Sequence, residues 1–274
     1  MIEDTVTIGG LGPVSYRDFL LPCCSACNSR LLGPIERRIK RALESSQLGG
    51  LPPPQLAAWA CKIILGTQFY ERAGRDDTTE DSGGEKASRD YLAGLRGKRI
   101  VHHRNHAGFP FSILWLKTKL RADPKRNFDF RVNPYGQSLF LRLGNYSLLA
   151  RPDYGYISRY GRDFFSRYVH HEHAPLQVEE LAAHFFAMAD CSLGDHARRQ
   201  VAPSSVDGVT VLESIDLGHR VLFTVEVHER FRYWFVTLTE ATEEDLFDLP
   251  GGGRRTFFGA EGSFVEIDAE AGCH

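Results

Sequence analysis

LLPCCSACNSR, residues 20–30, places a Cys-x-x-Cys pair on a short turn directly before a basic segment. Cys24 and Cys27 are spaced so that both thiolates can reach one Zn²⁺, with Cys23 as an alternative to Cys24. A structural zinc site takes four ligands, so this pair supplies only half of one. The alternative is a pair of reduced cysteines that bind no metal.

The segment after this turn has the pattern of an amphipathic helix. Pro34 suits the first helical position, and Ile35, Ile39 and Leu43 recur at four-residue spacing, which places them on one face. Five basic residues precede the helix or occupy its other face: Arg30, Arg37, Arg38, Lys40 and Arg41. This local surface is the expected contact for DNA phosphates, and an ordinary solvated helix face is the alternative.

The remaining pattern predicts an α+β fold, with an N-terminal knuckle and helical segment followed by a mixed, strand-rich region. Helices are expected over about 55–73, 87–97, 161–171 and 176–190, and an exposed polar loop over 74–86. Strands are expected over 111–116, 128–132, 138–143, 146–149, 208–215, 220–227, 232–239, 255–258 and 263–268. The corresponding segments are 1–48, 49–107 and 108–274, and the role of the last one stays open.

Composition limits the class of protein. The 274 residues are 42% hydrophobic and 25% charged, with a formal net charge of −2, so no global basic field indicates nucleic-acid binding. No apolar run approaches the roughly 20 residues that span a bilayer, and the acidic N-terminus does not resemble a signal peptide. Three of the six cysteines cluster within five residues, which favours a reducing compartment, and we expect a cytoplasmic location. The oligomeric state stays open.

Cys24-x-x-Cys27-Asn28, the later Glu36 and the run Trp59-Ala60-Cys61-Lys62 together resemble the second half of HNH endonuclease domains in their zinc-knuckle branch. These are ββα-metal nucleases, and the resemblance covers roughly residues 20–70. It implies a β-hairpin on a helix around a catalytic Mg²⁺ or Mn²⁺, a structural Zn²⁺ on Cys24 and Cys27, and hydrolysis of a phosphodiester bond in nucleic acid.

The resemblance also implies two site residues. Asn28 matches the central Asn, whose side chain ties the hairpin loop together and so orients the general base. Glu36 falls near the last metal ligand on the helix, where a carboxylate could hold Mg²⁺ or Mn²⁺. The alternative for Glu36 is a first-turn carboxylate stabilised by the helix dipole.

Residues 1–22 depart from the family because they contain neither Cys nor His. The first zinc pair and the general-base His are therefore missing from their usual place, and activation of water needs such a base. Either the chain is a truncated form of a longer nuclease-like protein, or it is a degenerate relative. We expect impaired hydrolysis, and the alternative function is a non-catalytic zinc-knuckle binding protein.

Two histidine clusters are further candidates for metal ligands. His102 and His106 stand four apart, and His170, His171 and His173 form a tighter group. Neither cluster has a recognised zinc-finger spacing from Cys27. The alternative is exposed, partly titrating loop histidines.

Overall fold

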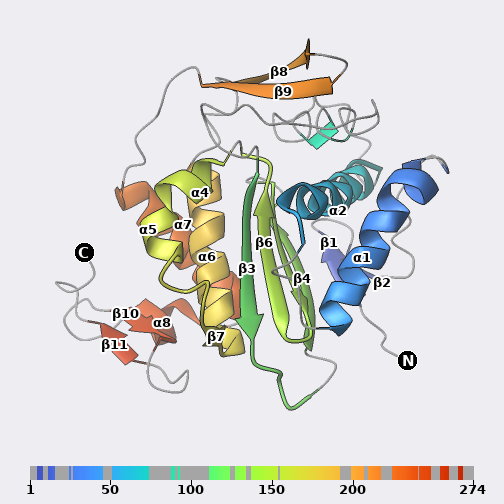
Figure 1. The fold of residues 1–274 in the computed structure, drawn as a ribbon. Helices are drawn as coiled ribbons and strands as arrows, with labels where there is room; N and C mark the ends of the chain where they lie inside the picture. The colour runs from blue at the N-terminus through green and yellow to red at the C-terminus, as the bar shows by residue number, and fades with distance from the viewer. Residues whose placement is uncertain are drawn as a thin grey trace.

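The computed structural model describes residues 5–8, 12–15, 25, 27–45, 51–73, 88–89, 92, 111–123, 127–133, 137–153, 155–191, 199–206, 209–216, 224–239, 241–247, 254–258 and 265–267. Within these ranges, helices surround a central mixed sheet, so the fold is α+β (Figure 1). The predicted loop over 74–86 lies outside the described residues.

The central sheet has five strands in the order β4-β5-β6-β3-β7. Its members are β3 (Ser112–Thr118), β4 (Phe128–Asn133), β5 (Ser138–Leu143), β6 (Tyr146–Arg151) and β7 (Glu172–His173). Neighbours are antiparallel except β3 and β7. The turn between β5 and β6 uses Gly144 at φ +60°, a conformation that glycine adopts without strain. The predictions of β3 to β6 are confirmed.

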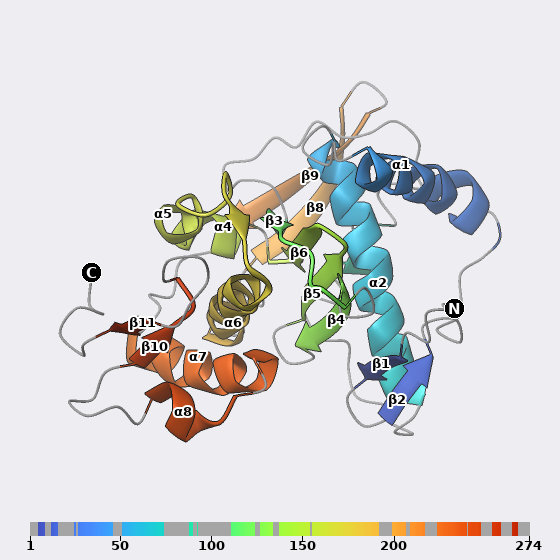
Figure 2. The same ribbon diagram turned by 90° about the horizontal axis from the view of Figure 1, so that it is seen from below.

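Alternating side chains bury both faces of this sheet. Trp115, Leu141 and Leu148 belong to an apolar cluster with Ala60 and Ile64 of α2 (Pro53–Ala73). The intervening positions Leu116, Phe140 and Leu149 belong to the cluster of α6 (Pro175–Cys191). Figure 2 shows the sheet between α2 and α6. Burial on both faces explains why these strands are almost continuously apolar in sequence.

Helix α7 (Thr224–Thr239) corrects the strand predictions over 220–227 and 232–239, which are wrong wherever the structure describes these residues. The segment is rich in β-branched and aromatic residues, which favour strands locally. However, Val227, Phe231, Trp234, Phe235 and Leu238 recur at helical spacing and pack in the α6 cluster. Tertiary packing on α6 therefore outweighs local propensity.

Buried polar groups join α6 to its neighbours. Arg142 Nη2 donates to Glu179 Oε1 at 3.0 Å, and Arg121 Nη2 forms a second ion pair with the same oxygen. Arg151 Nη1 donates to the Ala189 carbonyl at 2.6 Å. Burial lowers the pKa of Arg151 to about 10, so its guanidinium stays charged at neutral pH. These contacts fix the position of α6 on the sheet.

Two short helices, α4 (Tyr156–Tyr160) and α5 (Arg162–Phe165), meet at Gly161. The helix predicted over 161–171 is confirmed only over α5, since α4 precedes this range and residues 166–171 are not helical. A Cβ on Gly161 would lie 2.9 Å from both the Ile157 carbonyl oxygen and the Phe165 ring. Only glycine therefore fits this joint without displacing its neighbours.

The N-terminal part contains a hairpin, a π-helical turn and two helices. Strands β1 (Thr5–Ile8) and β2 (Gly12–Ser15) pair antiparallel, and β1 contacts β4 and α2. The turn η2 (Cys27–Leu32) leads directly into α1 (Gly33–Glu44), which contacts α2. The helix predictions for α1 and α2 are confirmed.

The remaining elements are α8 (Glu243–Phe247), the hairpin β8 (Arg199–Val206)–β9 (Val209–Asp216) and the hairpin β10 (Arg254–Thr256)–β11 (Val265–Ile267). The Glu180 carboxylate ties β10 to α6, because it accepts hydrogen bonds from Thr256 Oγ1 and the Phe257 amide, each at 2.7 Å. Among the described helices, none has the length and apolar character needed to cross a membrane. The segment boundaries at 48 and 107 stay predictions.

Candidate functional site

Three polar side chains from η2, α1 and α2 meet at one point. Lys62 Nζ donates to Asn28 Oδ1 at 3.1 Å and to Glu36 Oε1 at 2.6 Å. The side chain of Lys62 is 18% exposed and that of Glu36 is 39% exposed, so water reaches the pair. The structure thus brings together the two residues proposed as catalytic, with a lysine between them.

Local backbone geometry creates this meeting point. The π-helical turn places Asn28 one wide turn before Gly33. A Cβ on Gly33 would lie 3.0 Å from the Asn28 carbonyl oxygen, so the close approach favours glycine. Glu36 then falls in the first turn of α1, where the helix dipole stabilises a carboxylate.

The ion pair decides whether Glu36 is suited to hold a divalent cation. A carboxylate oxygen that accepts from an ammonium at 2.6 Å would have to lose that partner before binding Mg²⁺ or Mn²⁺. The positive Lys62 would also repel the cation at this distance. The described residues at Glu36 therefore fit an ion pair rather than a catalytic metal.

Lys62 is the residue that the sequence interpretation did not assign. It is the only charged residue between Pro53 and Phe69, in a helix that is otherwise mostly buried. A single cation within an apolar helix indicates a specific partner, because a largely buried ammonium loses hydration and needs one. That signal was present in the sequence, but it did not identify Glu36 as the partner.

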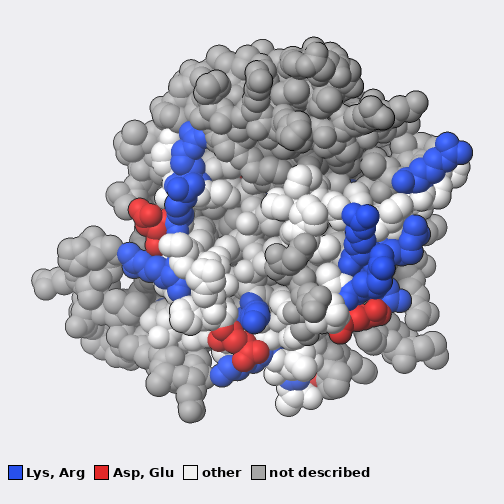
Figure 3. Space-filling model, viewed as in Figure 1, with Lys and Arg blue, Asp and Glu red and all other residues white. Residues whose placement is uncertain are grey.

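The basic residues of α1 form an exposed surface. Arg30 precedes the helix, and Arg37, Arg38, Lys40 and Arg41 are exposed along it, while Ile39 and Ala42 are buried. Figure 3 shows Lys and Arg side chains gathered over α1, with acidic atoms at one end. The ion pair in this group joins Lys40 to Glu44 at 3.9 Å, with both side chains more than 60% exposed. We call these five basic residues the α1 basic face.

The proposed zinc ligands cannot be located by side-chain geometry. Cys24 lies outside the described residues, and only the backbone of Cys27 lies within them. Within the described part of the chain, no group of three or more His, Cys, Asp or Glu side chains has the arrangement of a metal site. Zinc on Cys24 and Cys27 stays a prediction.

Of the histidines considered as metal ligands, only His173 is buried among the described residues. His102 and His106 lie outside the described residues, and His170 and His171 are exposed. His173 is buried, with Nε2 2.8 Å from the Tyr168 carbonyl oxygen and its ring 6.0 Å from that of Phe258. Burial lowers the pKa of His173, so it stays neutral at pH 7.

The thiol of Cys61 lies within the resemblance region but is unsuited to metal binding or nucleophilic attack. Its residue is fully buried in an apolar cluster with Ala57, Ala58 and Phe111. Burial raises the pKa of this thiol far above its ordinary value, which disfavours the reactive thiolate. Cys61 is therefore a core residue.

No protein-family model matches this chain, and no curated protein and no solved structure matches it. The resemblance to HNH endonucleases therefore rests on the quoted motif residues alone.

Proposed function

We propose that this protein binds nucleic acid, with DNA as the expected ligand, through the α1 basic face of an HNH-endonuclease-like module. The supporting observation is that five cations are exposed on one short segment, while a single exposed carboxylate pairs with one of them. Regularly spaced guanidinium and ammonium groups suit phosphate oxygens along a nucleic-acid backbone. The α1 basic face would supply sequence-independent affinity.

In this proposal phosphodiester hydrolysis, which the resemblance implies, is impaired. Glu36 is engaged by Lys62, and the general-base His is missing from residues 1–22. No described group replaces that base beside Asn28. The module then works as a nucleic-acid contact rather than as an efficient nuclease, which also covers the alternative of a non-catalytic zinc-knuckle binding protein.

Salt-dependent binding tests the nucleic-acid proposal. Fluorescence anisotropy with a labelled duplex should give an apparent Kd that rises steeply with salt, because cation contacts release counterions. The variant Arg37→Gln/Arg38→Gln/Arg41→Gln should weaken binding at least tenfold and flatten the slope of log K against log salt by about 2–3, at about 0.9 per phosphate contact.

A matched control removes three exposed cations elsewhere, in Lys119→Gln/Arg167→Gln/Arg230→Gln. It changes net charge equally, so it should leave the slope near that of the wild type. Equal loss in both triple variants, or binding that ignores salt, would contradict a specific role for the α1 basic face.

Two further measurements separate the parts of the proposal. Plasmid nicking with Mg²⁺ or Mn²⁺ should be weak, and robust cleavage that Asn28→Ala abolishes would disprove impairment.

Metal analysis of the purified protein tests the knuckle: we expect one zinc per chain, lost in Cys24→Ser/Cys27→Ser. Zinc-free wild-type protein would show that the knuckle is a relic.

A further inference from the structure

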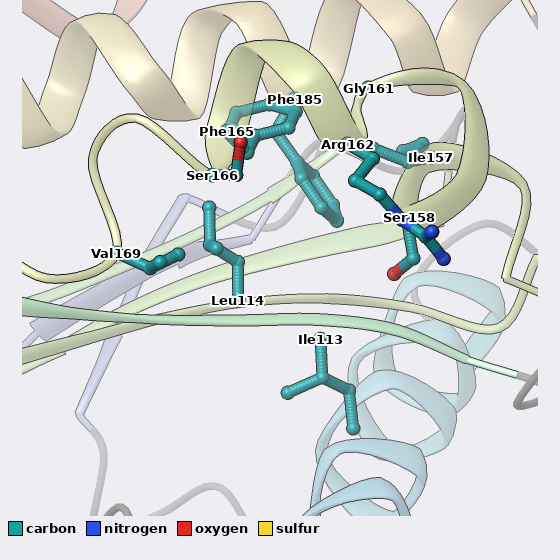
Figure 4. A pocket seen from close by; sticks show the side chains of 10 residues that line it. All are labelled: Ile113, Leu114, Ile157, Ser158, Gly161, Arg162, Phe165, Ser166, Val169 and Phe185. Atoms are coloured by element: carbon teal, nitrogen blue, oxygen red, sulfur yellow. The ribbon is translucent and has the colours of Figure 1, made fainter.

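A cavity lies between β3 and the helices α4 and α5, away from the α1 basic face. Its volume is about 210 Å³. Apolar side chains form most of its wall, namely Leu114, Ile157, Phe165, Val169 and Phe185. Figure 4 shows Leu114 directed toward α4 and α5, while the Ile113 side chain points to the opposite face of the sheet.

The cavity lies beside a part of β3 that β7 does not pair with. Among the described residues, β7 pairs with β3 only at Lys117 and Thr118. The Thr118 amide donates toward the β6 side, to Asn145, and the Lys119 amide donates toward β7, to His173. Because backbone groups alternate along a strand, the peptide groups of Ile113 also face the open side of β3. Helices α4 and α5 cover this gap, and their Gly161 joint keeps Phe165 close to α4.

One end of the cavity is polar and positively charged. Ser158 and Arg162 are both exposed and both line it, and Figure 4 shows the Arg162 side chain reaching toward Ser158. No described carboxylate lies within ion-pair distance of the Arg162 guanidinium. The stretch 158–167 contains three arginines and one aspartate, so its net charge of +2 favours an anion. Figure 3 shows basic side chains over α4 and α5.

The size and polarity of the cavity define a class of ligand. A dry apolar cavity of about 150 Å³ accepts benzene, so 210 Å³ has room for a somewhat larger apolar group. A guanidinium beside a hydroxyl is suited to a carboxylate. We propose that this cavity binds a short aliphatic carboxylate, about six to eight carbons long. The chain would lie against Leu114, Phe165 and Phe185, and the carboxylate would meet Arg162 and Ser158.

Octanoate is the probe for the first test. Titration of the whole ¹⁵N-labelled protein should give saturable amide shifts at Gly161 and neighbouring residues, with a Kd on the order of 0.1–1 mM, as its ten heavy atoms and partial burial suggest. Octan-1-ol, which lacks the charge, should bind at least tenfold more weakly. Absence of saturable binding to folded protein would overturn the proposal.

Matched variants assign the carboxylate. Arg162→Gln should weaken octanoate at least tenfold and leave octan-1-ol unchanged, because only the carboxylate loses a partner. Arg167→Gln removes an exposed cation that does not line the cavity, so it should have little effect. If octanoate affinity fell equally in both variants, the loss would reflect net charge rather than a contact with Arg162, and the proposal would be overturned.

A third variant tests the apolar part. Val169→Phe would fill one end of the cavity and should weaken octanoate and octan-1-ol together, with circular dichroism confirming the native fold. Unchanged affinity in folded Val169→Phe would place the ligand elsewhere. Tighter binding of acetyl-Gly-Leu than of octanoate, lost in Arg162→Gln, would assign the site to peptide C-termini and overturn the aliphatic ligand.

Discussion

The glutamates Glu179 and Glu36 both accept from basic side chains, but they differ in their access to water. Glu179, on α6, is 4% exposed and pairs with Arg142, which is 1% exposed. Glu36, on α1, is 39% exposed and pairs with Lys62. Burial removes water from around both Glu179 and Arg142. Glu36 and Lys62 keep part of their hydration. Breaking the pair in the sheet region should therefore cost far more than breaking the pair at α1, and the cations of the α1 basic face stay exposed to ligands.

Burial has opposite consequences for the two members of the Glu179 pair. It raises the pKa of the Glu179 carboxyl and lowers that of Arg142, even though each attracts the other. Desolvation thus outweighs attraction within the pair. Removing one member of such a pair is therefore costly, because it leaves the other charge buried without its partner.

The largest effect is expected from Arg142→Met. It leaves the buried Glu179 with only Arg121, so the free energy of unfolding should fall by about 3–5 kcal/mol in chemical denaturation. The double variant Arg142→Met/Glu179→Leu should recover part of this loss, since it removes the buried carboxylate and leaves only Arg121, whose side chain is 19% exposed, without its partner. A loss below about 1 kcal/mol for the single variant would contradict the contrast with Glu36.

The next effect compares one glycine from each region. Gly161→Ala places a methyl group 2.9 Å from a carbonyl oxygen and from the buried Phe165 ring, so it should cost about 1–3 kcal/mol of stability. Gly33→Ala meets a carbonyl at 3.0 Å and otherwise the flexible Arg37 side chain, and should cost less. The reverse order in thermal unfolding would show that α1 is the more tightly constrained region.

A smaller effect concerns pH and the buried His173. Its pKa in the folded protein lies below the ordinary 6.5, because burial disfavours the charged ring. The unfolded chain therefore binds the proton more readily, and the stability present above pH 6.5 is lost as the pH falls toward the folded-state pKa. Denaturation at a series of pH values should show a shallower decline in His173→Gln than in the exposed control His170→Gln. Identical profiles would contradict this assignment.

The smallest effect on stability is expected at the partly exposed Glu36–Lys62 ion pair. Glu36→Gln or Lys62→Met should change the free energy of unfolding by about 1 kcal/mol or less, because solvent screens a partly exposed ion pair. The same denaturation assay measures it beside Arg142→Met. A loss equal to that of Arg142→Met would remove the distinction between the two regions.

The sequence predicted those elements whose periodicity agrees with their final packing. The four-residue spacing of Ile35, Ile39 and Leu43 identified α1, and continuous apolar runs identified the strands buried on both faces. The same reasoning failed for α7, where aromatic and β-branched residues concealed a helical spacing. It also missed α4 and extended α5 to residue 171, because the tight joint at Gly161 depends on contacts rather than on pattern.

The candidate site was predicted less completely. The motif predicted Asn28 and Glu36, and local helical spacing predicted the α1 basic face. Both signals lie within a short stretch of sequence. The contact of Lys62 with Glu36 joins residues 26 positions apart, so it depends on how α1 packs on α2. The cavity at α4 and α5 joins side chains from β3, α4, α5 and α6, which are far apart in the sequence, so no local pattern predicts it.

The most direct test of nucleic-acid binding is the slope of log K against log salt, measured between about 50 and 200 mM for a labelled duplex. We expect a steep negative slope for the wild-type protein, reduced by about 2–3 in Arg37→Gln/Arg38→Gln/Arg41→Gln. The Lys119→Gln/Arg167→Gln/Arg230→Gln control should keep the wild-type slope. A slope near zero for the wild type, or the same slope in all three proteins, would contradict the proposed role of α1.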